Sequence, residues 1–151
     1  MAPITKPPTG GAFVHPSGGV DSTSVTLRFF GDDLDPEELS ELLGAQPTLS
    51  RCRGEPIPGQ EGRLAETGSW LLSSERQSKS PLEIQVAALF GRLTGDLDVW
   101  RQLTRRFYAD LFCGLWSEAF NRGTELSPEV LRMVADRGLR LGLDVYFVTS
   151  E

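Results

Sequence analysis

Five acidic residues stand within seven positions of the stretch GDDLDPEELSELL, which covers residues 31–43. They are Asp32, Asp33, Asp35, Glu37 and Glu38. Carboxylates at this density are the oxygen ligands that calcium or magnesium prefers. A calcium loop, however, presents oxygens at alternate positions around a central glycine, and this stretch has Pro36 where that turn would lie. The spacing therefore does not favour a metal site, and we predict none here.

The same stretch has the signature of a helix start. Asp35 can accept hydrogen bonds from unpaired backbone N–H groups, and Pro36 costs nothing at the first helical position. Glu37 meets the positive end of the helix dipole. Asp32 and Asp33 are not explained by this cap, so a small binding role for them stays open.

The helix-start pattern recurs twice. LSPEVLRMVADRG at 126–138 repeats it with Ser127 as the cap and Gly138 as the left-handed stop, the role that Gly44 takes in the first helix. SPLE at 80–83 is typical of a capping box in which Glu83 reaches back to the cap.

Few catalytic chemistries are compatible with this composition. His15 is the only histidine and lies in the Pro- and Gly-rich tail at residues 1–22, so Ser–His and Cys–His catalysis and most zinc sites are nearly excluded. The phosphate-binding patterns GxGxxG and GxxxxGK do not occur. Asp110 and Asp144 each interrupt an apolar run, and a buried carboxylate pair would provide acid–base catalysis. The alternative is that both face solvent from a half-covered sheet.

One basic and aromatic group lies in or beside the long loop that follows residue 48. Arg51, Arg53 and Arg63, with Trp70 next along, have the chemistry to clamp an anion or to stack on a flat ligand. Solvated surface arginines are the simpler interpretation. Cys52 stands between two arginines, which would lower the pKa of its thiol and make it reactive. An inert thiol is the simpler interpretation.

Apolar periodicity predicts the elements that position these groups. Strands are expected at 24–30, 69–74, 107–116 and 140–148, and helices at 35–44, 127–138 and twice between 80 and 106. The two β–α–β stretches suggest duplicated halves with two helices between them. We therefore expect an α+β fold: a four-stranded, mainly antiparallel, ferredoxin-like sheet with helices on one face.

Alternation also divides the strand residues between the two faces of this sheet. One set contains Leu27, Phe29, Leu111, Cys113, Leu115, Val145 and Phe147, which we expect under the helices. The other set contains Arg28, Phe30, Asp110, Phe112, Trp116, Asp144 and Tyr146. An exposed aromatic face of this kind is typical of a binding site for a protein partner or a second copy of the chain.

Composition sets the broad limits. The 151 residues fit a disordered tail at 1–22, rich in Pro, Gly, Ser and Thr, and a single domain at 23–151. A net charge of −6 opposes nucleic-acid binding. No apolar run reaches the length of a membrane span, and no apolar signal region precedes the domain, so we expect a cytoplasmic protein.

Several of these motifs together resemble a known family. GDDLDPEELSELLG followed by QPT, RGEP at 53–56, GSWLLSS at 68–74 and LSPEVLRMVADRGLRLGLDVY at the end are similar to the bacterial family called domain of unknown function 4279. The likeness covers roughly residues 24–149. The resemblance implies a small cytoplasmic bacterial domain and assigns no activity, cofactor or catalytic residue.

The sequence thus favours a non-enzymatic binding module that takes no cofactor. It would recognise a protein through the bare sheet face or the acidic helix at 35–43, for instance as an immunity-type protein that neutralises a toxin. A binder of small anions at Arg51, Arg53, Arg63 and Trp70 is the alternative. An enzyme using Asp110 and Asp144 is the third hypothesis.

Overall fold

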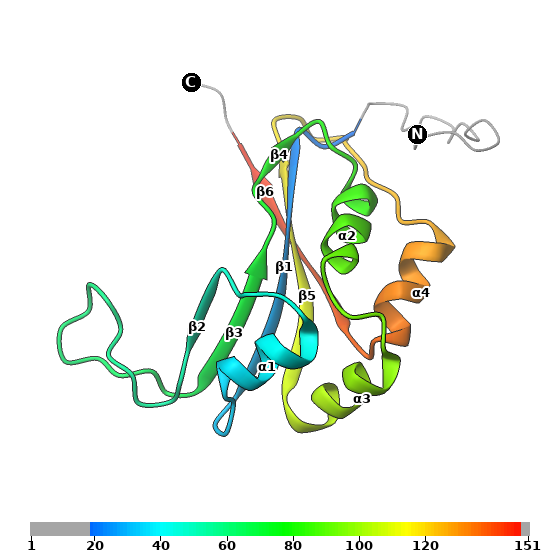
Figure 1. Ribbon diagram of the computed structural model, residues 1–151. Coiled ribbons are helices and arrows are strands. Elements are labelled where there is room, and N and C mark those ends of the chain that lie inside the picture. The colour runs from blue at the N-terminus through cyan, green and yellow to red at the C-terminus, as the bar shows by residue number, and fades with distance from the viewer. Residues whose placement is uncertain (1–18, 149–151) are drawn as a thin grey trace.

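The computed structural model describes residues 19–148 of the chain (Figure 1). Its strands are β1 (Ser22–Gly31), β2 (Leu49–Arg51), β3 (Gly68–Ser73), β4 (Gln77–Ser78), β5 (Tyr108–Ser117) and β6 (Arg140–Phe147). Its helices are α1 (Pro36–Leu43), α2 (Leu82–Gly91), α3 (Leu97–Arg106) and α4 (Pro128–Asp136). The predicted α+β class and all four expected strands are confirmed.

The strands form one sheet in the order β2-β3-β1-β5-β6, with β4 paired to the beginning of β1. All neighbouring strands are antiparallel except β5 and β6, which are parallel and connected by α4. Long β1 lies in the middle and pairs with β3 on one side and with β5 on the other. The two longest strands therefore form the centre of the sheet.

The sheet differs from the expected four-stranded arrangement in two respects. It has six strands, because β2 and β4 contain only three and two residues and are too short to show an alternating pattern. The two halves are also not equivalent: β1 and β3 are antiparallel, whereas β5 and β6 are parallel. The reason is that β2 follows α1 and pairs with β3 as a hairpin, while α4 leads directly into β6. A duplicated ferredoxin-like sheet is not confirmed.

Two of the three predicted helix starts are confirmed. The Asp35 carboxylate accepts the backbone N–H of Glu37 at 3.0 Å, and the Ser127 hydroxyl accepts that of Val130 at 3.3 Å. Gly44 and Gly138 have φ angles of 78° and 73°, as left-handed helix stops require. The acids of the opening stretch thus include a true N-cap.

The third predicted helix start is wrong, and its residues have a different role. α2 begins after Pro81, which offers no side-chain cap. The Glu83 carboxylate accepts the backbone N–H of Ser127, the cap residue of α4, at 2.8 Å. A capping box normally satisfies that donor from within the same helix. Here α2 supplies the acceptor for α4 and thereby joins the two helices.

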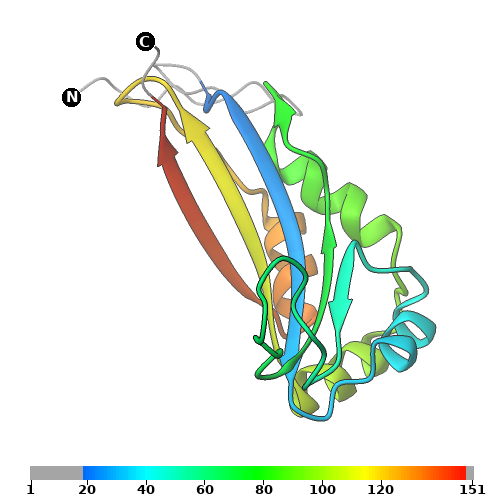
Figure 2. The same cartoon turned by 90° about the vertical axis from the view of Figure 1, so that its left-hand side faces the viewer.

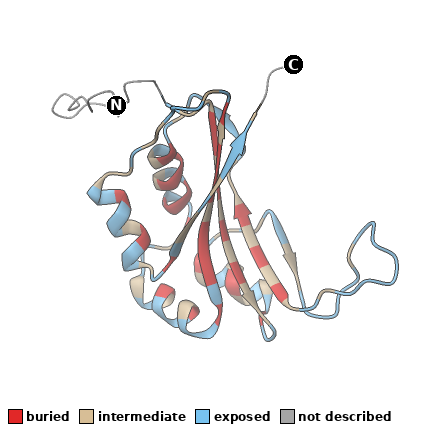
Figure 3. Cartoon of the chain, turned by 180° about the vertical axis from the view of Figure 1, so that it is seen from behind, coloured by how far each residue is buried: buried red, intermediate tan, exposed pale blue. Residues whose placement is uncertain are grey.

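All four helices pack on the same face of the sheet (Figures 1 and 2). Between the two layers lies the core, which contains the fully buried β1 residues Val25, Leu27 and Phe29 and the indoles of Trp70 and Trp100. The central strands are accordingly the most buried part of the chain (Figure 3). In the described part of the chain, no helix covers the opposite face.

The beginning of the fold lies slightly earlier than predicted. Residues 1–18 of the expected tail, which include His15, lie outside the described residues. Gly19 already forms a bridge with Gly123, and the backbone N–H of Asp21 donates to the carbonyl of Trp116 at 2.8 Å. Ordered structure therefore includes residues 19–22, which the sequence had placed in the tail.

Candidate functional site

The face of the sheet that has no helices, here called the open face, gathers the residues expected for partner binding. Side chains on it occupy even-numbered positions of β1, β5 and β6, because the odd-numbered neighbours in β1 and β5 are buried in the core. All seven expected residues share this face: Arg28, Phe30, Asp110, Phe112, Trp116, Asp144 and Tyr146. Tyr108 and Arg140 lie there as well.

An ion pair occupies the centre of the open face. The Arg28 guanidinium donates two hydrogen bonds to the Asp110 carboxylate, at 2.8 and 2.6 Å, and the Tyr108 hydroxyl donates a third at 3.2 Å. The Asp110 side chain is only 6% exposed, against 27% for that of Arg28. The hydrogen bond to Asp110 raises the pKa of Arg28, so the guanidinium stays charged near neutral pH.

Aromatic rings flank this pair. The guanidinium carbon of Arg28 lies 4.3 Å from the ring centre of Phe112 and 5.5 Å from that of Phe30. Cation–π contacts at these distances hold the flat guanidinium between the two rings. The pair is therefore fixed in position by β1 and β5 together.

A second aromatic group lies at the far end of the same face. The rings of Trp116 and Tyr146 stack at 5.0 Å with an interplanar angle of 11°, and the Arg76 guanidinium lies 4.1 Å over the Trp116 ring. The Tyr146 hydroxyl donates to Asp144, and this hydrogen bond raises the pKa of the phenol. The result is a rigid three-layer stack of cation, indole and phenol.

Two glycines make room for these rings. A Cβ at Gly114 would lie 2.6 Å from the Trp116 ring, and a Cβ at Gly142 would lie 3.4 Å from the ring of Phe112. Because both positions lack a side chain, Trp116 and Phe112 lie against the backbone instead of standing away from it. This flattens the open face.

The structure does not bring Asp110 and Asp144 together. Asp110 stands opposite Arg140 and Asp144 stands opposite Gly114, so four strand positions separate them. At about 3.3 Å per residue this amounts to roughly 13 Å. Each carboxylate is bound by a separate tyrosine. They cannot share a proton, and the pair required by the carboxylate-enzyme hypothesis is not formed.

The four residues of the expected anion site separate into three places. Arg51 and Arg63 line one hollow of about 360 Å³ beside Phe30, between the open face and the loop 52–67. The Arg53 guanidinium is outside this hollow and pairs with Asp32 at 3.4 Å. Trp70 is fully buried under α1, where its indole N–H donates to the Ser40 hydroxyl at 3.1 Å. Only two of the four are therefore placed to meet a common ligand.

Neither cysteine is activated. Desolvation, and then the hydrogen bond and negative charge of Glu55, raise the pKa of the exposed Cys52 thiol, so the expected lowering by Arg51 and Arg53 is wrong. Burial raises the pKa of Cys113 to about 12. Both thiols are protonated at neutral pH.

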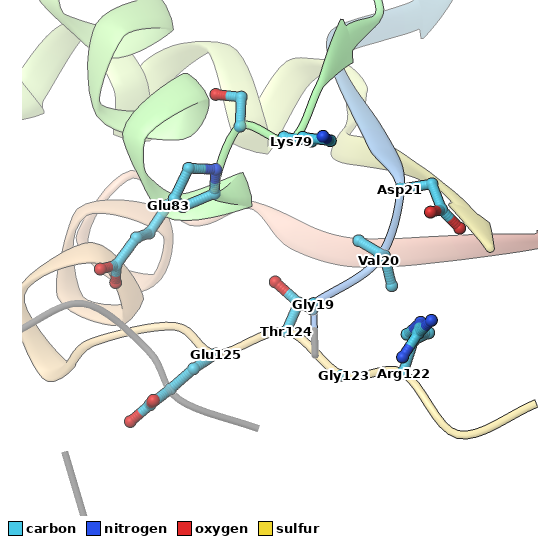
Figure 4. A pocket seen from close by; sticks show the side chains of 11 residues that line it. Gly19, Val20, Asp21, Lys79, Glu83, Arg122, Gly123, Thr124 and Glu125 are labelled. Atoms are coloured by element: carbon cyan, nitrogen blue, oxygen red, sulfur yellow. The ribbon is translucent and has the colours of Figure 1, made fainter. Parts of the chain in front are cut away.

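A further hollow, of about 410 Å³, lies on the helical side (Figure 4). Its wall joins the start of β1, the segment before α2 and residues 122–125. Its lining includes Lys79 and Arg122 as well as Asp21, Glu83 and Glu125, so charged residues of both signs surround the space. Because Glu83 already binds the backbone of Ser127, this hollow is part of the junction between the helices.

Three open-face residues were not singled out from the sequence. Tyr108 and Arg140 occupy even-numbered strand positions like their neighbours, so the alternating pattern could have placed both on the open face. Arg76 follows the end of β3, where no periodicity indicates its direction. Its place over Trp116 depends on tertiary structure.

Comparison with known proteins adds one match. Residues 21–148 match the family described as Domain of unknown function (DUF4279). A comparison with curated proteins gives no match, and a comparison with solved structures gives none either. No helix of the described part is long and apolar enough to cross a membrane, and residues 19–148 contain no group of three metal-ligating side chains. The chain belongs to the DUF4279 family.

Proposed function

We propose that the protein is a cytoplasmic, non-enzymatic binding module that recognises a protein partner through its open face. The observation that supports this is the composition of the face. A sheet side that only meets water is normally polar. Here the face holds Phe30, Phe112, Trp116 and Tyr146, together with arginines whose guanidinium groups lie over these rings.

The arrangement has the properties of a protein-binding surface. Tyr, Trp, Phe and Arg are the residues enriched at interface centres, where a few of them contribute most of the affinity. The stacking of Trp116 on Tyr146 and the ion pair of Arg28 fix these side chains before binding. Binding would then cost less side-chain entropy than it would if these side chains were mobile in the free protein.

The charges around the face indicate the chemistry of the partner. Arg76 and Arg140 lie at its margins, and Arg51 and Arg63 line the hollow under the loop 52–67. The chain as a whole is acidic, with a net charge of −6. A partner with an apolar centre and carboxylates at its rim fits this distribution, one carboxylate entering the hollow between the two arginines. An immunity-type protein that neutralises a toxin is one form of this proposal.

Affinity capture from a lysate of the source organism tests the proposal with three baits. The first is the unaltered chain, the second carries Phe30→Asp and Trp116→Ala on the open face, and the third carries Ile84→Glu. Ile84 is 59% exposed on α2, on the helical side, and serves as the matched control. We expect a protein that the first and third baits retain and the second loses, with at least about tenfold weaker binding when the interaction is reconstituted.

Two results would contradict this proposal. One is a partner that binds the double variant as well as the unaltered chain, once circular dichroism has shown that the variant is folded. The other is a partner lost with Ile84→Glu alone, which would place the interface on the helices.

A further inference from the structure

Strand β6 lies at the edge of the sheet, and its helix-facing side is largely bare. Leu143, Val145 and Phe147 are 52%, 65% and 52% exposed, although their β5 neighbours on the same face are buried. The helices lie behind the other strands, as Figure 2 shows for α4, and β6 is mostly exposed toward its end in Figure 3. The expectation that Val145 and Phe147 are covered by helices is therefore wrong. Phe120 is 94% exposed and extends this apolar row, with its ring centre 4.8 Å from that of Phe147.

The free edge of β6 also presents unpaired backbone groups. The N–H of Val148 donates to the Ser117 carbonyl of β5 at 2.9 Å. Because successive residues of a strand direct their N–H and C=O groups to alternate sides, even-numbered residues face β5 and odd-numbered residues face outward. Within the described part of the chain, β6 has no neighbour on that outer side. Edge strands are commonly protected by Pro, Lys or a bulge, and β6 has no Pro or Lys.

Antiparallel pairing of this edge with itself gives a self-complementary register. With a twofold axis at Leu143, that residue meets its own copy, and Leu141 meets the partner subunit's Val145. On the open face Arg140 meets the partner subunit's Tyr146 and lies diagonal to the partner subunit's Asp144. Opposite charges thus lie diagonal to each other at two places in the dimer. A register centred on Asp144 would instead place two carboxylates together, so charge disfavours that register.

We propose that the protein forms a twofold dimer by antiparallel pairing of β6 with β6 of a second copy, which makes one sheet continuous across both chains. The bare row of Leu143, Val145 and Phe147 then continues into that of the second copy. Pairing backbone to backbone also satisfies the outward N–H and C=O groups of the odd-numbered residues. A second copy is the occupant that fits, because each copy supplies both the cation and the anion that the register requires.

Sedimentation velocity on the full chain tests the dimer with a matched pair of variants. The N–H of Val145 faces outward, so Val145→Pro removes no bond to β5, and Pro is tolerated at such edge positions. Because both copies in the dimer carry the proline, it obstructs the pairing of the two strands at two places. We expect the dimer to weaken at least about a hundredfold in Val145→Pro and to persist in Val145→Thr.

A second variant keeps the test decisive if the proline variant does not fold. Leu143→Glu places two carboxylates against each other at the axis, whereas Ile84→Glu adds the same charge on α2. Dimers lost in the first and kept in the second support the proposal. A chain that is monomeric at about 100 μM, where a micromolar dimer would be almost fully formed, overturns it. A dimer that survives both β6 changes, or one lost in Ile84→Glu, overturns it equally.

Discussion

Arg28 and Asp110 show how single side chains shape the open face. The sheet places them opposite each other on β1 and β5, and the arginine is the cation that pairs with the nearly buried Asp110 carboxylate. Removing one partner of a buried pair leaves an uncompensated charge, which is far more costly than losing both. The pair therefore contributes as much to the order of the face as to its binding chemistry.

A double-mutant cycle on this pair gives the first prediction in this section. Arg28→Met should lower the free energy of unfolding by about 3 kcal/mol, because it leaves the Asp110 carboxylate buried and unpaired. Asp110→Leu should cost less, since Arg28 can still reach water. The double variant should lose clearly less than the sum of the two, as urea unfolding monitored by tryptophan fluorescence can measure.

The exposed pair of Arg101 and Asp98, at 3.1 Å, is the control for this cycle. Arg101→Met should change stability by no more than about 0.5 kcal/mol, because water already solvates both groups. Equal effects of Arg28→Met and Arg101→Met would show that the burial of Asp110 has no energetic consequence.

At the scale of elements, features that depend on neighbouring residues could be predicted from the sequence, whereas features that depend on tertiary contacts could not. The four long strands and the caps at Asp35 and Ser127 were predictable because each depends on neighbouring residues alone. Strands β2 and β4 were not, since two or three residues carry no period. The split of the expected anion site follows the same rule: Trp70 was grouped with the loop arginines by proximity along the chain, but its place in β3 points it into the core.

The contact between α2 and α4 is a tertiary feature that resembles a local one. Glu83 was predicted to cap its own helix, and it accepts the backbone N–H of Ser127, the cap residue of α4, instead. We expect Glu83→Ala to destabilise the fold by about 1–2 kcal/mol, because the N–H of Ser127 loses its acceptor. Glu83→Gln keeps an acceptor oxygen and should lose less than half as much in the same thermal or urea unfolding measurement.

Glu129→Ala separates this contact from a general helix-dipole effect. Glu129 also lies in the first turn of α4, but no hydrogen bond links it to α2. Its removal should cost only a few tenths of a kcal/mol. If Glu83→Ala and Glu129→Ala have the same small effect, the link between the two helices is not a stabilising contact.

At the scale of the whole molecule, stability and accessibility are distributed unevenly across the sheet. β1 is bonded on both edges and buried by helices on one face, whereas β6, among residues 19–148, is bonded on one edge and is mostly exposed. Function is proposed for the less protected parts: the open face, the loop 52–67 and the β6 edge. This matches the general pattern in which binding regions come from the less stable parts of a fold.

Hydrogen exchange followed by NMR resolves this distribution and the proposed dimer together. Amides of Leu27 and Phe29 should exchange slowest, at rates near the global unfolding limit. In β6 the amides of Gly142, Asp144 and Tyr146 face β5 and should be protected at every protein concentration. Those of Leu141, Leu143 and Val145 face outward and should gain protection of about tenfold or more only as the dimer forms.

The alternation itself distinguishes edge pairing from other contacts. Docking through the open face would cover side chains of β6 without supplying acceptors to its odd-numbered amides, so no alternating gain would appear. In Val145→Pro the amides of Leu141 and Leu143 should exchange fast at all concentrations while Gly142 stays protected. Fast exchange at these two positions in the unaltered chain, at a concentration where sedimentation shows a dimer, would place the dimer contact elsewhere. The β6 edge would then be free to receive a strand from another protein.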